Sequence, residues 1–302
     1  MIGELAKAYQ GLRFESLMSF IRKLGEGRIW QRIFSERLTE PLHLNLLSLL
    51  VAAFGSSRQK INYDLMVRHH NAFCILKAAD IATRYGVKQL SLLEFGVAAG
   101  AGLLNMAHIA RTVTKITDVE FNIFGFDTGE GMPEPKDYRD HPELYQAGDF
   151  PMDCEKLQSR LPDNTKLVLG PVEATVPAFL ETLPSSSPIG YVVIDLDYYS
   201  STKSAFKVFE GPPEHYLPVS LLYVDDIMYD EHNSWCGELL ALHEFNAEHP
   251  MRKIERHVYL ETRRIFRKAP WTKHVFFLHV LDHSSRTRSR VQAPTVLTNP
   301  YL

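Results

Sequence analysis

From residue 90 onward, short apolar runs alternate with stretches of helical periodicity, and this alternation limits the possible folds more than any other feature. Strands joined through helices form parallel sheets, because a parallel connection needs a long crossover. Largely apolar strands also indicate a sheet that is covered on both faces. The predicted strands are Leu90–Phe95, Phe121–Phe126, Lys166–Leu169, Tyr191–Ile194 and Val219–Val224, and the predicted helices between or after them are Leu103–Thr114, Ser201–Phe209 and Cys236–His249. The sequence therefore predicts an α/β fold with a doubly wound, mostly parallel sheet.

The two flanks of this region differ from its middle. Arg256–Leu260 and His274–Leu281 have the pattern of strands without a long helix between them, which predicts a terminal antiparallel strand and brings the sheet to seven strands. Upstream, a helix is predicted from Asp64 to Tyr85, ended by Gly86, because glycine readily adopts the left-handed conformation that ends helices. We expect three parts: an N-terminal helical extension (1–60), the α/β domain (61–283) and a mobile tail (284–302).

Composition excludes several classes of protein. The chain is 45% apolar and 23% charged, with a net charge of −3, which is typical of soluble globular proteins and not of disordered ones. This charge gives no overall field that would attract nucleic acid or an anionic membrane, so neither is expected as a partner. Three cysteines far apart in the sequence indicate reduced thiols and a cytoplasmic location.

One leucine-rich segment, Pro41–Phe54, needs a separate explanation. It is shorter than the roughly 20 residues that span a bilayer, and no export signal is evident before it. We expect a helix that is buried against the rest of the chain, with the interface of a homo-oligomer as the alternative.

A glycine-rich turn follows the first predicted strand, with the sequence Glu94-Phe-Gly96-Val-Ala-Ala-Gly100-Ala-Gly102. Glycines permit a tight turn and close approach of a ligand to the backbone, but a turn of this kind can also be purely structural. Neither the dinucleotide pattern G-x-G-x-x-G nor a phosphate-binding P-loop is present. Asp127 ends the second strand, where an acid is placed to bind ribose hydroxyls in doubly wound sheets.

Acidic residues also end the fourth and fifth predicted strands. Asp195 and Asp197 follow one strand, and Asp225 and Asp226 follow the other. Carboxylates gathered at one sheet edge repel each other unless they are protonated or neutralised by a cation, and Mg²⁺ prefers oxygen ligands. The alternative is that each acid caps a helix or turn, as Asp197 would at Ser201. A long connection, residues 128–165, is rich in proline, glycine and acids, and is expected to be functional or disordered.

These residues resemble known enzymes. Glu94-x-Gly96-x-x-x-Gly100-x-Gly102 resembles the first motif of class I S-adenosylmethionine-dependent methyltransferases, and Asp127 resembles their ribose-binding acid. Four further motifs occur in the order of the macrocin O-methyltransferase family, over roughly residues 60–250: Gly125-Phe-Asp127-Thr-Gly-Glu130-Gly131-Met-Pro133, Gly148-Asp149-Phe150-Pro151, Asp195-Leu-Asp197-Tyr-Tyr199-Ser-Ser201-Thr202 and Asp225-Asp226. The chain departs from the family where Leu196 replaces the glycine of Asp-Gly-Asp and Gly129 replaces the phenylalanine of Phe-Glu-Gly.

The resemblance implies a Rossmann-like class I methyltransferase domain and two cofactors, S-adenosylmethionine and Mg²⁺. Gly96 and Gly100 would border the methionine part of S-adenosylmethionine, and Asp127 would lie near its ribose. Glu94 would also belong to the cofactor site. Val172 and Glu173 would lie near the adenine.

By the same resemblance, Asp195, Asp225 and Asp226 would hold Mg²⁺, and the methyl group would pass to a hydroxyl of a small molecule such as a natural-product sugar. Asp195 is the first choice as general base, with Asp197, His232 and His243 as alternatives. Three other functions remain open. One is a Mg²⁺-dependent methyltransferase for catechol-like or lipid acceptors, and another is a non-catalytic S-adenosylmethionine-binding protein. A nicotinamide-dependent oxidoreductase is disfavoured by the missing G-x-G-x-x-G pattern.

Overall fold

The computed structural model describes residues 37–228 and 230–287. The contacts within the chain define two compact units. The smaller unit joins the chain up to Leu65 with Val258–Pro270, and the larger unit contains Met66–His257 and the chain from Trp271 onward. Predictions that concern residues 1–36 and 288–302 lie outside the described residues.

The larger unit is built on a seven-stranded sheet with the order β3-β2-β1-β4-β5-β7-β6. β7 is antiparallel to its two neighbours, and the other four pairings are parallel. This order is that of the class I methyltransferase fold, so the predicted fold class and the antiparallel terminal strand are confirmed. The strands are β1 (Gln89–Phe95), β2 (Glu120–Asp127), β3 (Thr165–Leu169), β4 (Ile189–Ile194), β5 (Tyr216–Val224), β6 (Arg252–Arg256) and β7 (Val275–Val280).

One predicted strand is wrong in position. The strand expected at Arg256–Leu260 lies at Arg252–Arg256, and Leu260 instead begins a short helix, α11 (Leu260–Arg263). β6 is the edge strand of the sheet, and Ile254 is its one apolar residue. The apolar run used for the prediction therefore belongs to the segment after the strand.

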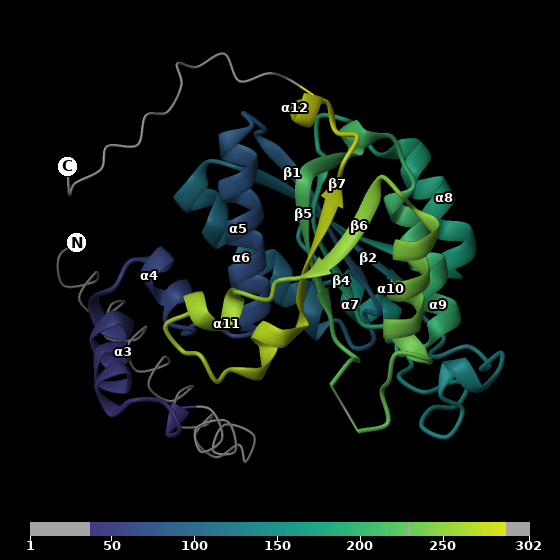
Figure 1. Ribbon diagram of the computed structural model, residues 1–302, viewed down its shortest axis with the longest axis horizontal. Helices are drawn as coiled ribbons and strands as arrows, with labels where there is room; N and C mark the ends of the chain where they lie inside the picture. The colour runs from purple at the N-terminus through teal and green to yellow at the C-terminus, as the bar shows by residue number, and fades with distance from the viewer. Residues whose placement is uncertain (1–36, 229, 288–302) are drawn as a thin grey trace, which may run out of the picture. The chain divides into compact units, whose positions relative to one another are not determined.

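Helices cover both faces of the sheet (Figure 1). α5 (His69–Arg84) and α6 (Ala101–Thr117) pack together on one face, and α8 (Val172–Thr182), α9 (Tyr199–Ala205) and α10 (Gly237–Glu248) lie on the other. The core on the second face joins Phe126 and Ile194 of the strands to Val176 of α8 and Phe245 of α10. The remaining elements of this unit are α7 (Cys154–Gln158), α12 (Ser284–Thr287) and the 3₁₀ turns η2 (Tyr138–Asp140), η3 (Phe206–Phe209), η4 (Pro213–His215) and most of η5 (Pro270–His274).

The predicted helix from Asp64 to Tyr85 begins later than expected. Asp64 and Arg68 both have a φ of 52°, a left-handed conformation that interrupts helical hydrogen bonding, and α5 therefore starts at His69. The other end is confirmed, because Gly86 has a φ of 71° and the Val87 N–H donates to the Ala82 carbonyl at 2.9 Å. The helix predicted over Ser201–Phe209 consists of α9 followed by the 3₁₀ turn η3.

The smaller unit contains α3 (Leu42–Phe54), α4 (Ser57–Asn62) and α11. A buried ion pair between Arg264 and Asp64 ties its two chain segments together. The predicted helix at Pro41–Phe54 exists, but the expectation that it is buried is wrong, since Leu42 is 71% exposed and Phe54 is 87% exposed. Among the described residues, no helix has the length and apolar character of a membrane span. None of the three cysteines forms a disulfide bond.

Candidate active site

The carboxyl ends of four parallel strands meet at one edge of the sheet. The register pairs Phe95 of β1 with Phe126 of β2 and with Ile194 of β4, and it pairs Ile194 with Val224 of β5. The residues that end or follow these strands are therefore neighbours, as the sequence predicted. They include the glycine turn, Asp127, and the acids after β4 and β5.

Asp127 holds the glycine turn in place. Its Oδ2 accepts hydrogen bonds from the backbone N–H groups of Val97 and Ala98, both at 2.9 Å, and its Oδ1 accepts one from Gly129 at 2.7 Å. Ala98 has a φ of 45°, so these bonds stabilise a strained turn. Sequence reasoning predicted a ribose-binding acid at this position and missed its role as a clamp on the turn.

Two glycines of the turn are required because each has a positive φ and a close neighbour where a Cβ would lie. Gly96 has a φ of 83°, and a Cβ on it would lie 1.7 Å from the carbonyl oxygen of Asp195. Gly100 has a φ of 81° and precedes α6, where a Cβ would lie 2.3 Å from Leu157 Cδ1. Any side chain at Gly96 would therefore push the ends of β1 and β4 apart.

Glu94 lies beneath the turn, at the end of β1. Its side chain is buried, and Oε2 has no hydrogen-bond partner among the described residues. Burial, together with repulsion from Asp195, raises the pKa of Glu94 to about 8, and the guanidinium of Arg68 opposes this shift. Glu94 is therefore a carboxyl group that titrates near neutral pH.

The two residues predicted near the adenine lie at the start of α8, directly after β3 and the Gly170 turn. Val172 is 7% exposed and packs in the hydrophobic core. Glu173 forms an ion pair with Lys136, with 3.2 Å between Oε1 and Nζ. The assignment of these two residues to the adenine stays a prediction.

The acids after β4 and β5 form one electrostatic cluster. Burial, followed by repulsion from Asp225 and then Asp197, raises the pKa of Asp195 to about 7. Burial and, to a smaller extent, repulsion from Glu238 and Asp197 raise the pKa of Asp226 far above its usual value. Like charges that share a poorly solvated site resist ionisation in this way unless a cation is present.

Glu238 is a member of this cluster that sequence reasoning missed. It lies in the first turn of α10 and is fully buried. Its Oε1 accepts from the Leu196 N–H at 3.0 Å, and its Oε2 accepts from the Asp226 N–H at 3.1 Å. Glu238 therefore links the loop after β4 to the loop after β5.

The donor set of the cluster fits a hard divalent cation. Asp195, Asp225 and Asp226 offer only carboxylate oxygens, and Asp226 Oδ2 is buried without a hydrogen-bond partner among the described residues. As the side chains stand, the part of the chain that the structure describes contains no group of three or more His, Cys, Asp or Glu residues arranged to hold a metal ion. The chemistry of the donors thus fits Mg²⁺, and the metal assignment stays a prediction.

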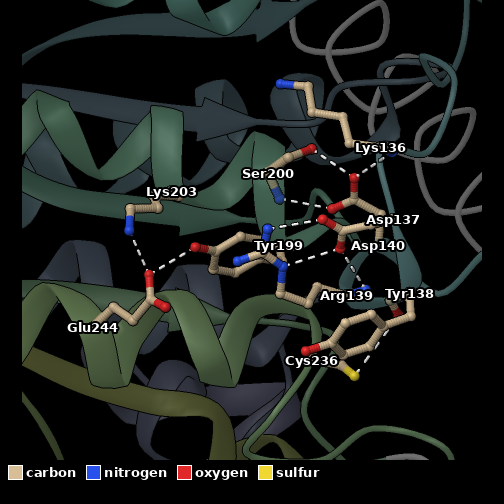
Figure 2. A network of polar contacts seen from close by, with 10 residues as sticks. All are labelled: Lys136, Asp137, Tyr138, Arg139, Asp140, Tyr199, Ser200, Lys203, Cys236 and Glu244. Atoms are coloured by element: carbon tan, nitrogen blue, oxygen red, sulfur yellow. Dashed lines mark hydrogen bonds and ion pairs between the residues drawn. The ribbon is translucent and has the colours of Figure 1, made fainter.

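Asp197 does not cap the following helix, so that alternative is wrong. It has a φ of 58°, and the N-cap of α9 is Tyr198, which provides no capping hydrogen bond from its side chain. The cap comes from the long connection instead. Asp140 accepts from the Ser200 N–H and from Ser200 Oγ, and also from the Lys136 N–H, each at 2.8 Å (Figure 2).

The long connection is therefore ordered against the acidic cluster over its middle part. Asp140 is 1% exposed, and the adjacent Arg139 places its guanidinium over the Tyr199 ring at 4.4 Å. Farther along the connection, the Tyr145 hydroxyl donates a hydrogen bond to Asp197. Residues 136–145 thus form one wall beside Asp197.

Two histidines face each other near Asp197. His141 belongs to the long connection and His232 to the loop after β5, and their ring centroids are 5.3 Å apart. His141 Nδ1 lies 2.9 Å from Glu143 Oε1. Burial lowers the pKa of His232, so this residue is suited to accept a proton as a neutral imidazole. His243, the other predicted alternative base, is exposed in α10.

Substitution of Asp140 by asparagine tests whether it docks the long connection. The amide nitrogen of asparagine cannot accept the hydrogen bond from the Lys136 N–H, so a partly buried donor loses its partner. Loss of about 1–3 kcal/mol of local stability should speed trypsin cleavage after Lys136 and Arg139 by roughly tenfold or more. The matched control is Asp137→Asn, because the side chain of Asp137 bonds to Arg139 of its own turn and, among the described residues, to no other element. Equal cleavage rates in both variants would contradict the docking role.

No protein-family profile matches the chain, and no curated protein is similar to it in sequence. It is similar to the solved O-methyltransferase NovP, with 15% identity over 69% of this chain and 78% of NovP and a TM-score of 0.47. The calicheamicin methyltransferase CalS11 is 20% identical over 78% of this chain and 90% of its own, with a TM-score of 0.47. MycE, a methyltransferase of the mycinamycin biosynthetic pathway solved with Mg and SAH, is 13% identical over 72% of this chain and 51% of its own, with a TM-score of 0.36.

Proposed function

We propose that the protein is an S-adenosylmethionine-dependent O-methyltransferase that transfers a methyl group, with assistance from Mg²⁺, to a hydroxyl of a small molecule such as a natural-product sugar. One observation carries this proposal. The glycine turn clamped by Asp127 and the acids after β4 and β5 occupy the same edge of one sheet. A nucleoside cofactor and a cation-bound acceptor would therefore lie next to each other.

The cofactor would lie along the glycine turn. Gly96 and Gly100 keep side chains away from its methionine part, and Glu94 offers a buried oxygen there. Asp127 uses three of its acceptor positions for the turn and keeps capacity for a ribose hydroxyl. Val172 and Glu173, at the start of α8, would border the adenine.

Asp195, Asp225 and Asp226 would hold Mg²⁺, which when bound makes a coordinated hydroxyl more acidic. Asp195 is also the proposed general base, the second duty that the resemblance implies for this position, since a carboxylate beside the acceptor can take the proton of its hydroxyl. Asp197 and His232 are the alternative bases, and the hydrogen bond from Tyr145 orients Asp197.

The acceptor oxygen, once its proton has passed to the base, would attack the methyl carbon in line with the carbon–sulfur bond. That bond breaks, and its electron pair stays on sulfur as S-adenosylhomocysteine forms. Positioning of the two reactants supplies much of the acceleration in reactions of this kind. The docked segment 136–145 would exclude water from the acceptor side.

The test combines binding and transfer. Calorimetry should detect S-adenosylhomocysteine and Mg²⁺ binding, and labelled S-adenosylmethionine should transfer its methyl group to a member of a panel of hydroxylated acceptors. Failure to bind S-adenosylhomocysteine would overturn the proposal. Binding without transfer to any sugar, catechol or lipid hydroxyl would favour the non-catalytic alternative, and transfer to catechols alone would reassign the acceptor.

The raised pKa values predict how stability depends on pH. Glu94 and Asp195 have ordinary values of 4.5 and 3.8, and pKa values of about 8 and about 7 in the folded protein. Between about pH 4 and pH 8 the folded state binds more protons than the unfolded state, so stability is lost as pH rises through this range. Without divalent cations, Tm should fall by several degrees from about pH 5 to about pH 8.5.

Millimolar Mg²⁺ should raise Tm more at the higher pH, where the carboxylates are ionised. Differential scanning calorimetry checks both results, and Glu94→Gln serves as the control because it removes one titrating group and should flatten the profile. A Tm that rises from pH 5 to pH 8.5 without Mg²⁺ would contradict the prediction.

A further inference from the structure

The peptide bond between Val224 and Asp225 joins the end of β5 to the acidic cluster. Its N–H group, which belongs to Asp225, donates to the Ile194 carbonyl of β4 at 3.0 Å. Its carbonyl oxygen, which belongs to Val224, lies 2.9 Å from Nδ1 of His274. Because a carbonyl oxygen can only accept, Nδ1 is the donor of this hydrogen bond. The peptide that carries Asp225 is therefore held at both of its polar atoms.

His274 lies at the point where the pairing of β5 with β7 stops. The register of this antiparallel pair ends at Tyr223 and Val275, so Val224 and His274 would form the next pair. His274 belongs instead to the 3₁₀ turn η5, and its imidazole makes the bond to the Val224 carbonyl. A side chain thus holds β5 at the position where the strand enters the site.

Packing fixes the orientation of the His274 imidazole. The residue is 8% exposed, and its ring is stacked on Tyr223, with 5.4 Å between the ring centroids and 21° between the ring planes. Tyr223 is buried as well and also stacks on His70, near the start of α5, with 3.9 Å between the centroids. A ring packed in this way keeps one orientation, so its hydrogen bond to Val224 has a fixed direction.

We propose that His274 is a positioning residue for the divalent cation, because its hydrogen bond to Val224 holds the backbone from which the Asp225 carboxylate reaches the cation. This inference rests on the proposed function, which assigns Mg²⁺ to the acids after β4 and β5. Asp226, the next residue, is held in a similar way, since its N–H donates to Glu238 Oε2 at 3.1 Å. Groups that orient metal ligands without touching the metal typically change metal affinity by roughly 10- to 100-fold.

Two substitutions separate the hydrogen bond from the packing of the ring. His274→Phe keeps an aromatic ring beside Tyr223 and has no donor, whereas His274→Asn keeps an N–H donor bonded to Cγ and loses the ring. Mn²⁺, which accepts the same oxygen ligands as Mg²⁺, is titrated into the full chain, and electron paramagnetic resonance measures the bound fraction. Mn²⁺ affinity should fall by roughly 10- to 100-fold in the phenylalanine variant and stay within about threefold of the wild type in the asparagine variant. The affinity for S-adenosylhomocysteine should be the same in all three proteins.

The matched control is His279→Phe, the same change near the far end of β7, at the residue paired with Val219, and it should bind Mn²⁺ as the wild type does. Undiminished Mn²⁺ binding in His274→Phe, or an equal loss in His274→Asn, would overturn the role of His274 and leave the metal assignment standing. Loss of S-adenosylhomocysteine binding together with Mn²⁺ in His274→Phe would show a general structural role and would also overturn it. A wild-type protein that binds no Mn²⁺ would overturn the metal assignment and this inference with it.

Discussion

Replacement of Asp225 by asparagine should abolish divalent-cation binding and lower methyl transfer by about three orders of magnitude, with cofactor affinity nearly unchanged. Asp225 follows β5, and its backbone N–H donates to the Ile194 carbonyl at 3.0 Å, which fixes it next to Asp195. Loss of one carboxylate ligand removes both charge and an oxygen donor from the metal site. A bound cation stabilises the charge of the transition state by several kcal/mol, and each 1.36 kcal/mol of activation free energy corresponds to a tenfold change in rate.

The cation can be followed without knowledge of the acceptor. Mn²⁺ serves as a paramagnetic stand-in for Mg²⁺, and its electron paramagnetic resonance spectrum reports binding to the wild type and the variants. Asp230→Asn is the matched control, because Asp230 lies exposed in the same loop. Asp195→Asn should lose Mn²⁺ as Asp225→Asn does, with S-adenosylhomocysteine binding retained. Undiminished Mn²⁺ binding in both variants, or full activity in excess chelator, would refute the metal assignment.

The fold was predictable because its information is local. Each parallel strand is an apolar run of a few residues, so the strands and their order along the chain can be read directly from the sequence. Strand polarity then places Asp127, Asp195 and Asp225 at one edge without any knowledge of side-chain packing. The edge strand β6 was misplaced because only Ile254 in it is apolar, and an edge strand needs little burial.

The parts of the site that escaped prediction depend on contacts between distant residues. Asp140 bonds to Ser200 sixty positions away, and Glu238 bonds to Leu196 forty-two positions away. Neither acid differs in its local sequence from an ordinary surface residue, so no periodicity or spacing reveals its burial. Arg68 was likewise hidden within a predicted helix, because nothing in the local pattern reveals its left-handed backbone with a φ of 52°.

Removal of the Asp127 side chain, which clamps the glycine turn, should cause the second large effect, a loss of cofactor binding. Asp127→Ala removes the acceptor for three backbone N–H groups, those of Val97, Ala98 and Gly129, and also the proposed partner of the ribose. Each partly buried donor left without an acceptor costs about 1–3 kcal/mol, so the turn should relax from the strained conformation that Ala98 adopts. S-adenosylhomocysteine binding should weaken by roughly 100-fold or more.

Calorimetric titration measures this loss, and the control is Asp118→Asn, which changes an exposed acid at the opposite end of α6. Asp127→Asn refines the test, because asparagine retains one carbonyl oxygen that can accept from Val97 and Ala98 while its amide group cannot accept from Gly129. Its affinity should therefore lie between those of the wild type and Asp127→Ala. Unchanged affinity in the alanine variant would remove the glycine turn from the cofactor site. It would leave the acids after β4 and β5 as a cation site without a neighbouring nucleoside.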